Sequence, residues 1–375
     1  MMMIIQTQNM NQQSRKQSRM RVIVEMSLNL VNPFMKFASG SGGAPFYKEL
    51  TRKVLASDDP QFVTDSFEGE ENLMIIINGT VKSATADPSF SYNSDYGTNF
   101  AYRQSAAGAS DFTVTSSRWL AIASGYADMP FTSVIYTDNL SDEEKIGVQH
   151  HVDTYGTGAG NPPYRRESVL KWANTSNAIT TISCWTTQSV TSPPSAFDSG
   201  AGSECIVLGF SDGSSGDTVW EELDSVATTG TTDSLNSNTF TGKDYLLVQI
   251  WANYTGDTNT KMTFNSDTGT NYSQRQSYAG GADGTRINQA NIGFDDSSVK
   301  DSLIQSMFIT NKSDQEKTAI MFQGTGTNGA ANAPYRIETY GKWANTSSQI
   351  TSIQLSQTNS GSYLADTTMK IWGFS

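Results

Sequence analysis

The chain has 375 residues, a length that suits two domains of about 100–200 residues each. It carries 37 Asp and Glu against 25 Lys and Arg, which gives a net charge of −12 at pH 7. This acidic balance argues against nucleic acid as a partner, because phosphate binding needs clustered cations. No apolar run approaches the roughly 20 residues of a membrane-spanning helix. Abundant Thr, Ser, Asn and Gly are typical of a β-rich protein, either extracellular or of another soluble kind.

The N-terminal stretch differs from the rest of the chain. Residues 1–25 are polar and basic and lack the apolar core of a secretory signal, and a start at Met26 would make them upstream sequence. An apolar, aromatic patch and a Gly/Ser tether follow. We predict that residues 1–44 form an arm that docks on a partner; an arm lying on the first domain is the alternative. The docking residues would be Leu28, Leu30, Phe34 and Phe37.

The rest of the chain is an internal repeat. The segment KWANTS occurs at 171–176 and again at 342–347, and YNSDYGTNF at 92–100 is answered by FNSDTGTNY at 264–272. Further pairs, such as Pro163-Tyr164-Arg165 and Pro334-Tyr335-Arg336, keep nearly the same offset. One domain has therefore been duplicated, with a period too long for a solenoid, whose repeats have about 20–50 residues. The sequence predicts copy one at 45–210, a linker at 211–217 and copy two at 218–375.

Short apolar segments separated by turn residues recur in both copies. With weak helical periodicity and no alternation of strands and helices, they indicate an all-β protein of two tandem antiparallel sandwiches. The expected strands include Leu73–Ile77, Thr132–Tyr136, Ile179–Trp185 and Cys205–Phe210 in copy one, and Leu246–Ile250, Leu303–Thr310, Ile350–Leu355 and Met369–Phe374 in copy two.

Two pairs of residues are predicted to belong to the cores. Trp172 and Trp343 each precede an alternating apolar strand, so we expect core anchors; exposed Trp in a ligand site is the alternative. Cys184 and Cys205 occupy positions filled in copy two by inward-facing Leu and Met, which predicts small core residues. A disulfide between the cysteines is left open, because it depends on Cβ geometry.

The sequence offers little for catalysis or metal binding. His150 and His151 are adjacent, so on a strand they would point to opposite faces and make a poor metal site. No nucleophile motif or phosphate loop is present, and we expect neither an enzyme nor a cofactor. One oxygen-rich turn in each copy could hold calcium, although Asx turns explain it without a metal. These calcium candidates are Asn93, Asp95 and Asn99, with Asn265, Asp267 and Asn271.

An ordered string of motifs in copy two resembles a known domain. It runs KDYLLVQIWA, FNSDTGTNY, KWANTSSQIT and KIWGF, and copy one follows it more loosely, ending in LGF. The string is similar to a jelly-roll-like β-sandwich domain common in structural proteins of tailed viruses of bacteria and archaea. Its motifs are turn and strand residues, so the resemblance transfers no catalytic residue.

The resemblance implies a virion structural or accessory protein, such as a capsid decoration, vertex or tail-associated protein. It would act as a homo-oligomer, most plausibly a trimer, with other virion proteins as partners. The first alternative is an adhesin module at the virion or cell surface that binds a receptor or host-surface glycan. The second is a double β-barrel major capsid protein, in which three two-domain chains would form a pseudo-sixfold unit.

Overall fold

A computed structural model describes residues 47–82, 87–122, 128–187, 199–210, 218–256, 259–294, 302–326 and 329–375. The described residues form antiparallel sheets and contain no α-helix, which confirms the all-β class. Leu28, Leu30, Phe34 and Phe37 lie outside the described residues, as does the predicted linker at 211–217. We call residues 47–210 half one and residues 218–375 half two.

Half one consists of a large and a small sheet. In the large sheet the strands lie in the order β1 (Lys48–Val54), β12 (Glu204–Phe210), β3 (Asn72–Thr80), β8 (Pro130–Asp138), β9 (Lys145–Asp153), β10 (Tyr164–Trp172), β5 (Phe100–Ala106) and β6 (Phe112–Ser117). In the small sheet the order is β2 (Gln61–Val63), β11 (Ile182–Thr187), β4 (Asp87–Tyr92) and β7 (Leu120–Ala121).

Half two repeats this order strand for strand. Its large sheet runs β13 (Glu221–Ala227), β25 (Thr368–Phe374), β15 (Tyr245–Thr255), β20 (Ser302–Thr310), β21 (Lys317–Gly326), β22 (Tyr335–Trp343), β17 (Tyr272–Tyr278) and β18 (Gly284–Gln289). Its small sheet runs β14 (Ser234–Asn236), β23 (Ile353–Gln357), β16 (Thr260–Phe264) and β19 (Ile292–Phe294). A short strand, β24 (Ser362–Tyr363), pairs with β15.

The strand order is that of a jelly roll with four added strands, the β8–β9 hairpin within the large sheet and β1 and β12 at its edge beyond β3. In the small sheet, β2, β11, β4 and β7 pair as the first, eighth, third and sixth strands of an eight-stranded jelly roll do. In the large sheet, β3, β10, β5 and β6 take the remaining places, and the β8–β9 hairpin is inserted between β3 and β10. The same order in both halves is what a duplicated domain requires.

Each half has its own core between its two sheets. In half one, Leu73, Ile75 and Ile77 of β3 meet Phe90 of β4 and Cys184 of β11. In half two, Leu246, Val248 and Ile250 take the same places on β15. Alternate residues of each strand point to this core, as the period of two in a strand requires.

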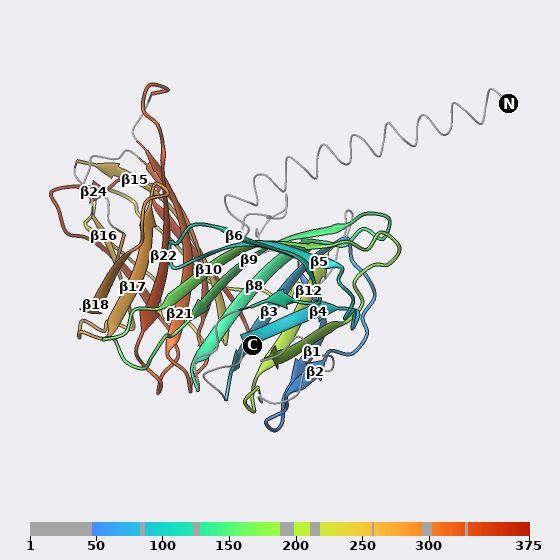
Figure 1. Cartoon of the computed structure of the whole chain (residues 1–375). Helices are drawn as coiled ribbons and strands as arrows, with labels where there is room; N and C mark the ends of the chain where they lie inside the picture. Colours follow the sequence, from blue (N-terminus) through green and yellow to red (C-terminus); the bar gives the residue numbers. More distant parts are fainter. Residues whose placement is uncertain are drawn as a thin grey trace.

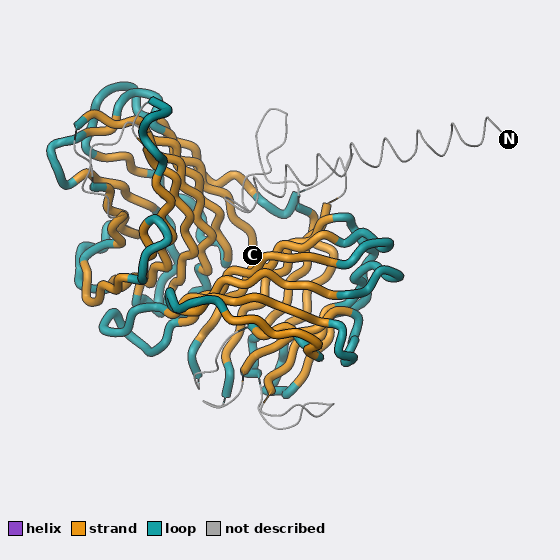
Figure 2. The backbone as a smooth tube through the Cα atoms, turned by 45° about the horizontal axis from the view of Figure 1, so that its top comes forward, coloured by secondary structure: helices purple, strands orange, loops and turns teal. Residues whose placement is uncertain are grey.

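A third core joins the two halves. The other faces of β3 and β12, with Met74, Ile76, Ile206 and Leu208, pack against the large sheet of half two. That sheet contributes Tyr245, Leu247, Phe308, Ile320, Tyr340, Trp372 and Phe374. The two large sheets are therefore the inner layers and the two small sheets the outer layers of one body (Figures 1 and 2).

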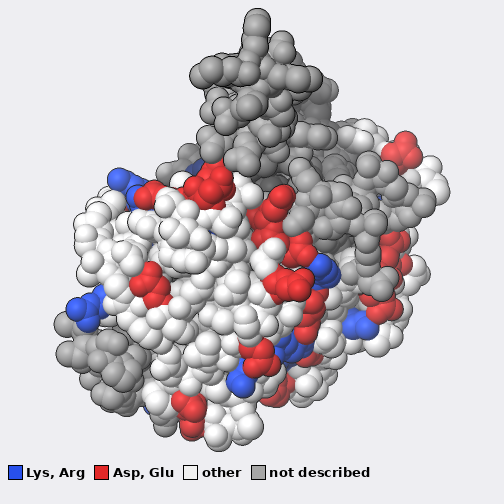
Figure 3. All heavy atoms as spheres, turned by 90° about the vertical axis from the view of Figure 1, so that its right-hand side faces the viewer, with Lys and Arg blue, Asp and Glu red and all other residues white. Residues whose placement is uncertain are grey.

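The surface agrees with the net charge. On the face shown in Figure 3, acidic side chains gather in a band with basic side chains among them, beside a broad uncharged area. Such a mixed, net-negative surface favours solubility.

Candidate functional site: the joint between the two halves

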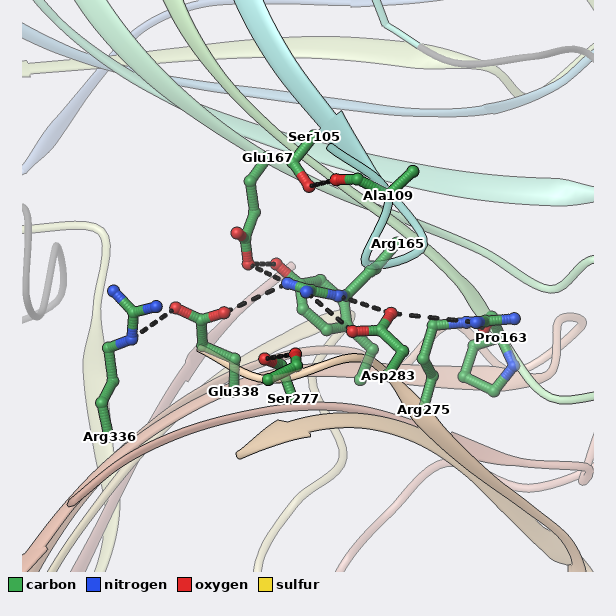
Figure 4. Close-up of polar contacts among 12 residues, drawn as sticks. Ser105, Ala109, Pro163, Arg165, Glu167, Arg275, Ser277, Asp283, Arg336 and Glu338 are labelled. Atoms are coloured by element: carbon green, nitrogen blue, oxygen red, sulfur yellow. Dashed lines mark hydrogen bonds and ion pairs between the residues drawn. The ribbon is translucent and has the colours of Figure 1, made fainter. Parts of the chain in front are cut away.

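The most elaborate polar structure of the described chain lies where the two halves meet, and we call this region the joint. Arg165, at the start of β10, is its centre, with a side chain that is 6% exposed. Its guanidinium donates to both carboxylate oxygens of Asp283 in half two, at 2.9 and 2.8 Å. It also donates to Glu167 Oε1 at 2.7 Å and to Glu338 Oε2 at 3.1 Å (Figure 4). A forked guanidinium matches a carboxylate in this two-bond geometry, which fixes direction as well as charge.

Carboxylates around Arg165 balance its positive charge, and the cluster shifts the pKa values of Arg165 and Glu338. Burial alone would lower the pKa of Arg165, but its hydrogen bond to Asp283 and the charge of Glu167 outweigh burial and raise it. Burial, and then the negative charge of Glu167, raise the pKa of Glu338 to about 7. Tyr340 donates its hydroxyl to Glu167 at 3.1 Å, and its ring lies under the Arg165 guanidinium. The joint is thus a paired, hydrogen-bonded cluster.

A loop of half one, between β9 and β10, extends this contact. Its carbonyls receive hydrogen bonds from half two: Pro163 from Arg275 at 2.9 Å, and Gly156 from Lys342 at 2.7 Å. The Gly158 N–H donates to Glu316 at 2.5 Å. Lys342 is fully buried, and its ammonium lies 3.3 Å from Glu316, so the lysine enters the joint as an ion pair.

The opposite end of the joint holds a second buried charge. Glu204, at the start of β12, is 2% exposed and accepts from the Tyr245 hydroxyl at 2.5 Å. Lys312 of half two lies 2.6 Å from the same carboxylate. Thr132 and Thr310 also share a hydrogen bond of 2.7 Å across the joint. Both ends of the apolar layer are therefore fixed by polar contacts of defined geometry.

The adjacent histidines point to opposite faces of β9, as predicted. The His150 ring faces the joint and meets the Phe322 ring edge-on at 4.5 Å. Burial lowers the pKa of His150 to about 4, so the ring is neutral at pH 7. His151 faces the core of half one near Phe131, where burial lowers its pKa against the opposing influence of Asp153. Neither histidine belongs to a group of potential metal ligands among the described residues.

The calcium-candidate turns use their oxygens as hydrogen-bond acceptors. Asn93 Oδ1 accepts the N–H groups of Thr180 and Thr181 at 2.8 and 3.1 Å. Asp95 accepts from the Gly97 N–H at 2.8 Å and from the Asn99 amide at 2.9 Å. Asn265, Asp267 and Asn271 do the same in half two. Asn93 and Asn265 have φ values of 54° and 53°, a left-handed conformation that Asn tolerates in turns.

The same turn fixes the repeated tryptophan. Trp172 is 1% exposed and donates its indole N–H to Asp95 at 2.7 Å; Trp343 is 2% exposed and donates to Asp267 at the same distance. Burial alone would raise the pKa of Asp95, but the hydrogen bonds from Trp172, Asn99 and Gly97 outweigh it and lower that pKa. Both tryptophans belong to the cores of their halves. The NSD-x-GTN and KWANTS motifs are therefore two parts of one structural contact.

Sequence reasoning missed two further members of this contact. Lys145 is buried and donates to the carbonyls of Glu143 and Asn174 at 2.7 and 2.9 Å, and Lys317 makes equivalent bonds at the same distances. Asn139 donates to the carbonyls of Glu70 and Ile179, and Asn311 is its counterpart. The internal repeat could have identified them, because Lys145 recurs as Lys317 and Asn139 as Asn311.

Cys184 and Cys205 are both buried in the core of half one, at the inward-facing positions that the repeat predicts. Both are free thiols, on β11 and β12 of the two facing sheets. Burial, and then the neighbouring Cys184, raise the pKa of the Cys205 thiol well above its ordinary value. A thiol in this environment is protonated and therefore unreactive as a nucleophile.

Comparisons with known proteins give no family. No protein-family model matches the chain, and no curated protein matches it. Among solved structures, a Pseudomonas aeruginosa FadL homologue aligns with 8% identity over 82% of this chain and 91% of that chain. The TM-score of 0.08 means that the alignment carries no argument about fold or function. Across the part of the chain that the structure describes, no helix is long and apolar enough to cross a membrane.

Proposed function

We propose that the chain is a structural or accessory protein of a virion, as a capsid decoration, vertex or tail-associated component. It would act by self-association, most plausibly as a homotrimer, and by docking on other virion proteins. The observation that carries the proposal is the joint, because it fuses two jelly-roll-like sandwiches into one body through a buried layer. A building element of a particle needs such rigidity. The motif string in half two adds independent support, and the proposal assigns no catalysis.

The experiment is quantitative mass spectrometry of purified particles from a virus that encodes this chain. Hundreds of copies per particle would indicate a shell or decoration protein, and a handful would indicate a tail component. Failure to find the chain in particles that are otherwise complete would refute the proposal. A double β-barrel major capsid protein is the alternative that the jelly-roll order in each half favours; it requires the chain to be the most abundant shell protein.

A surface aromatic pair favours the adhesin as a second candidate. Tyr278 and Tyr335 have ring centres 5.2 Å apart and are 37% and 38% exposed. Exposed tyrosines present an apolar face and a polar tip, which suits contact with a sugar ring. The test is binding of the intact chain to host-surface glycans, compared with a Tyr278→Ala variant. Equal retention of both proteins on every glycan would exclude this role for the pair.

A further inference from the structure

The two halves contribute different surfaces to the joint. Half one contributes residues 158–165, the end of the loop before β10 and the first residues of that strand, which we call the loop surface. Half two contributes the receiving surface, made by Arg275, Asp283 and Glu316 together with Lys342, whose ammonium pairs with Glu316 and donates to Gly156, just before the loop surface. Because the halves share one fold, each surface has a counterpart in the other half. Those counterparts are not brought together within the chain.

The receiving surface of half one carries the same charged residues, but there they are exposed. Asp283 is 2% exposed, whereas its counterpart Asp111 is 51% exposed. Arg275 is 14% exposed against 61% for Arg103. The other two positions behave alike: Lys342 and Glu316 are 0% and 7% exposed, and their counterparts Lys171 and Glu144 are both 44% exposed. Thus all four positions carry the same charge in both halves but are covered in half two alone.

The loop surface shows the reverse pattern. Residues 158–165 read GAGNPPYR and residues 329–336 read GAANAPYR, so the motif is nearly intact in half two. Arg165 is 6% exposed, but its counterpart Arg336 is 61% exposed and bonds to Glu338 of its own half. Every residue of 329–336 is exposed, whereas 158–165 is mostly buried or half-buried. Half two therefore presents a second loop surface to solvent.

We propose that copies of this chain associate head to tail by repeating the polar contacts of the joint between molecules, since the apolar layer of the joint is already covered within each chain. The loop surface of half two in one copy would occupy the receiving surface of half one in the next. Arg336 would pair with Asp111 as Arg165 pairs with Asp283, and Arg103 would donate to the Pro334 carbonyl as Arg275 donates to Pro163. An interface between two different surfaces is heterologous, so it closes into a ring or continues as a filament.

Apolar contacts in the same region fit a second copy. Val169 and Ile146 of half one are 45% and 44% exposed, beside the receiving surface. Their counterparts in half two, Tyr340 and Thr318, are buried. Covering these side chains would add hydrophobic stabilisation. Val169 lacks the hydroxyl with which Tyr340 bonds to Glu167, so the contact between copies would be weaker than the contact within the chain.

The head-to-tail contact rests on the proposed function, because it names the surfaces through which the chain would self-associate. Sedimentation velocity of the full-length chain over a range of concentrations tests it. We expect species larger than the monomer, weakened about 10-fold or more by Asp111→Arg or Arg336→Asp, since each places like charges together. The double variant restores opposite charges at the contact and should recover association. Asp65→Arg, at an exposed carboxylate in the loop after β2, is the matched control.

A chain that stays monomeric at every concentration would overturn the proposal, as would oligomers indifferent to both single variants. Single variants that both weaken association without recovery in the double variant would also overturn the Arg336–Asp111 pairing. Circular dichroism of each variant checks that the sheets remain folded. These results are independent of particle composition: association in solution without incorporation would refute the virion role alone. Incorporation of a monomeric chain would refute the head-to-tail contact and self-association but leave the virion role.

Discussion

Replacement of Arg165 by methionine tests whether the joint holds the molecule together. Methionine retains an apolar stem of similar length but removes the cation, leaving Asp283 at 2% exposure without its two-bond partner. Breaking a buried pair from one side costs about 3–5 kcal/mol. Arg275, 3.8 Å from Asp283, remains as partial compensation and places the loss at the low end of that range. Glu338 contributes less to this loss, because with a pKa of about 7 it can take up a proton. We therefore expect the free energy of unfolding to fall by about 3 kcal/mol, mostly through Asp283.

Urea unfolding followed by tryptophan fluorescence measures this loss. Arg336→Met is the matched control, because the equivalent arginine is 61% exposed and should cost at most about 1 kcal/mol. Both variants are measured at two protein concentrations, since any loss that comes from weaker association depends on concentration. Adding Asp283→Asn to Arg165→Met should recover part of the stability by removing the buried charge. A loss for Arg165→Met no larger than that for Arg336→Met would refute the reasoning.

Three further outcomes are expected. Trp343→Ala should cost about 3–5 kcal/mol in chemical denaturation because the indole is 2% exposed, and an unchanged melting temperature would contradict its place in the core. His150→Phe, which places in half one the residue found at Phe322 in half two, should make the free energy of unfolding less sensitive to acid. The pKa of His150 is about 4 in the folded chain and 6.5 ordinarily, so the unfolded chain binds a proton first as the pH falls. The wild type therefore loses about 3 kcal/mol of stability between pH 6.5 and pH 4 through this residue. Urea unfolding of the wild type and of His150→Phe at pH 7 and pH 4 measures how much stability each loses on acidification. Equal losses for the two proteins would contradict the prediction. Deletion of residues 1–43 should leave a folded, soluble protein that no longer joins the particle, and normal incorporation would exclude docking by the arm.

Much of each half was accessible from the sequence. Alternating apolar residues and Asx-rich turns predicted strands where β3, β8, β12 and their counterparts lie. The internal repeat predicted that one strand order would serve both halves. It also placed Cys184 and Cys205 inward, because their counterparts alternate with polar residues.

The joint was not predicted, although one signal was present. Leu73–Ile77 and Cys205–Phe210 are continuous apolar runs rather than alternating ones, which is the pattern of a strand buried on both faces. These runs were predicted as strands, but no partner was assigned to their second face. The charge cluster could not be foreseen, because Arg165 and Asp283 are 118 residues apart and meet only through the packing of the two sheets.

The repeated residues divide into two groups by their surroundings, and the division bears on how the chain works. Residues that build each half, such as Asp95 and Trp172, make the same contact at the same distance as Asp267 and Trp343. A duplicated fold alone explains why such residues persist. Arg336 and Asp111 also persist, yet neither makes the contact that their counterparts make in the joint. The fold of either half does not require these exposed charges, since each lies at the surface and contributes little to stability there. In the head-to-tail contact that we propose, a second copy of the chain would provide that contact for each, with the internal joint as its template.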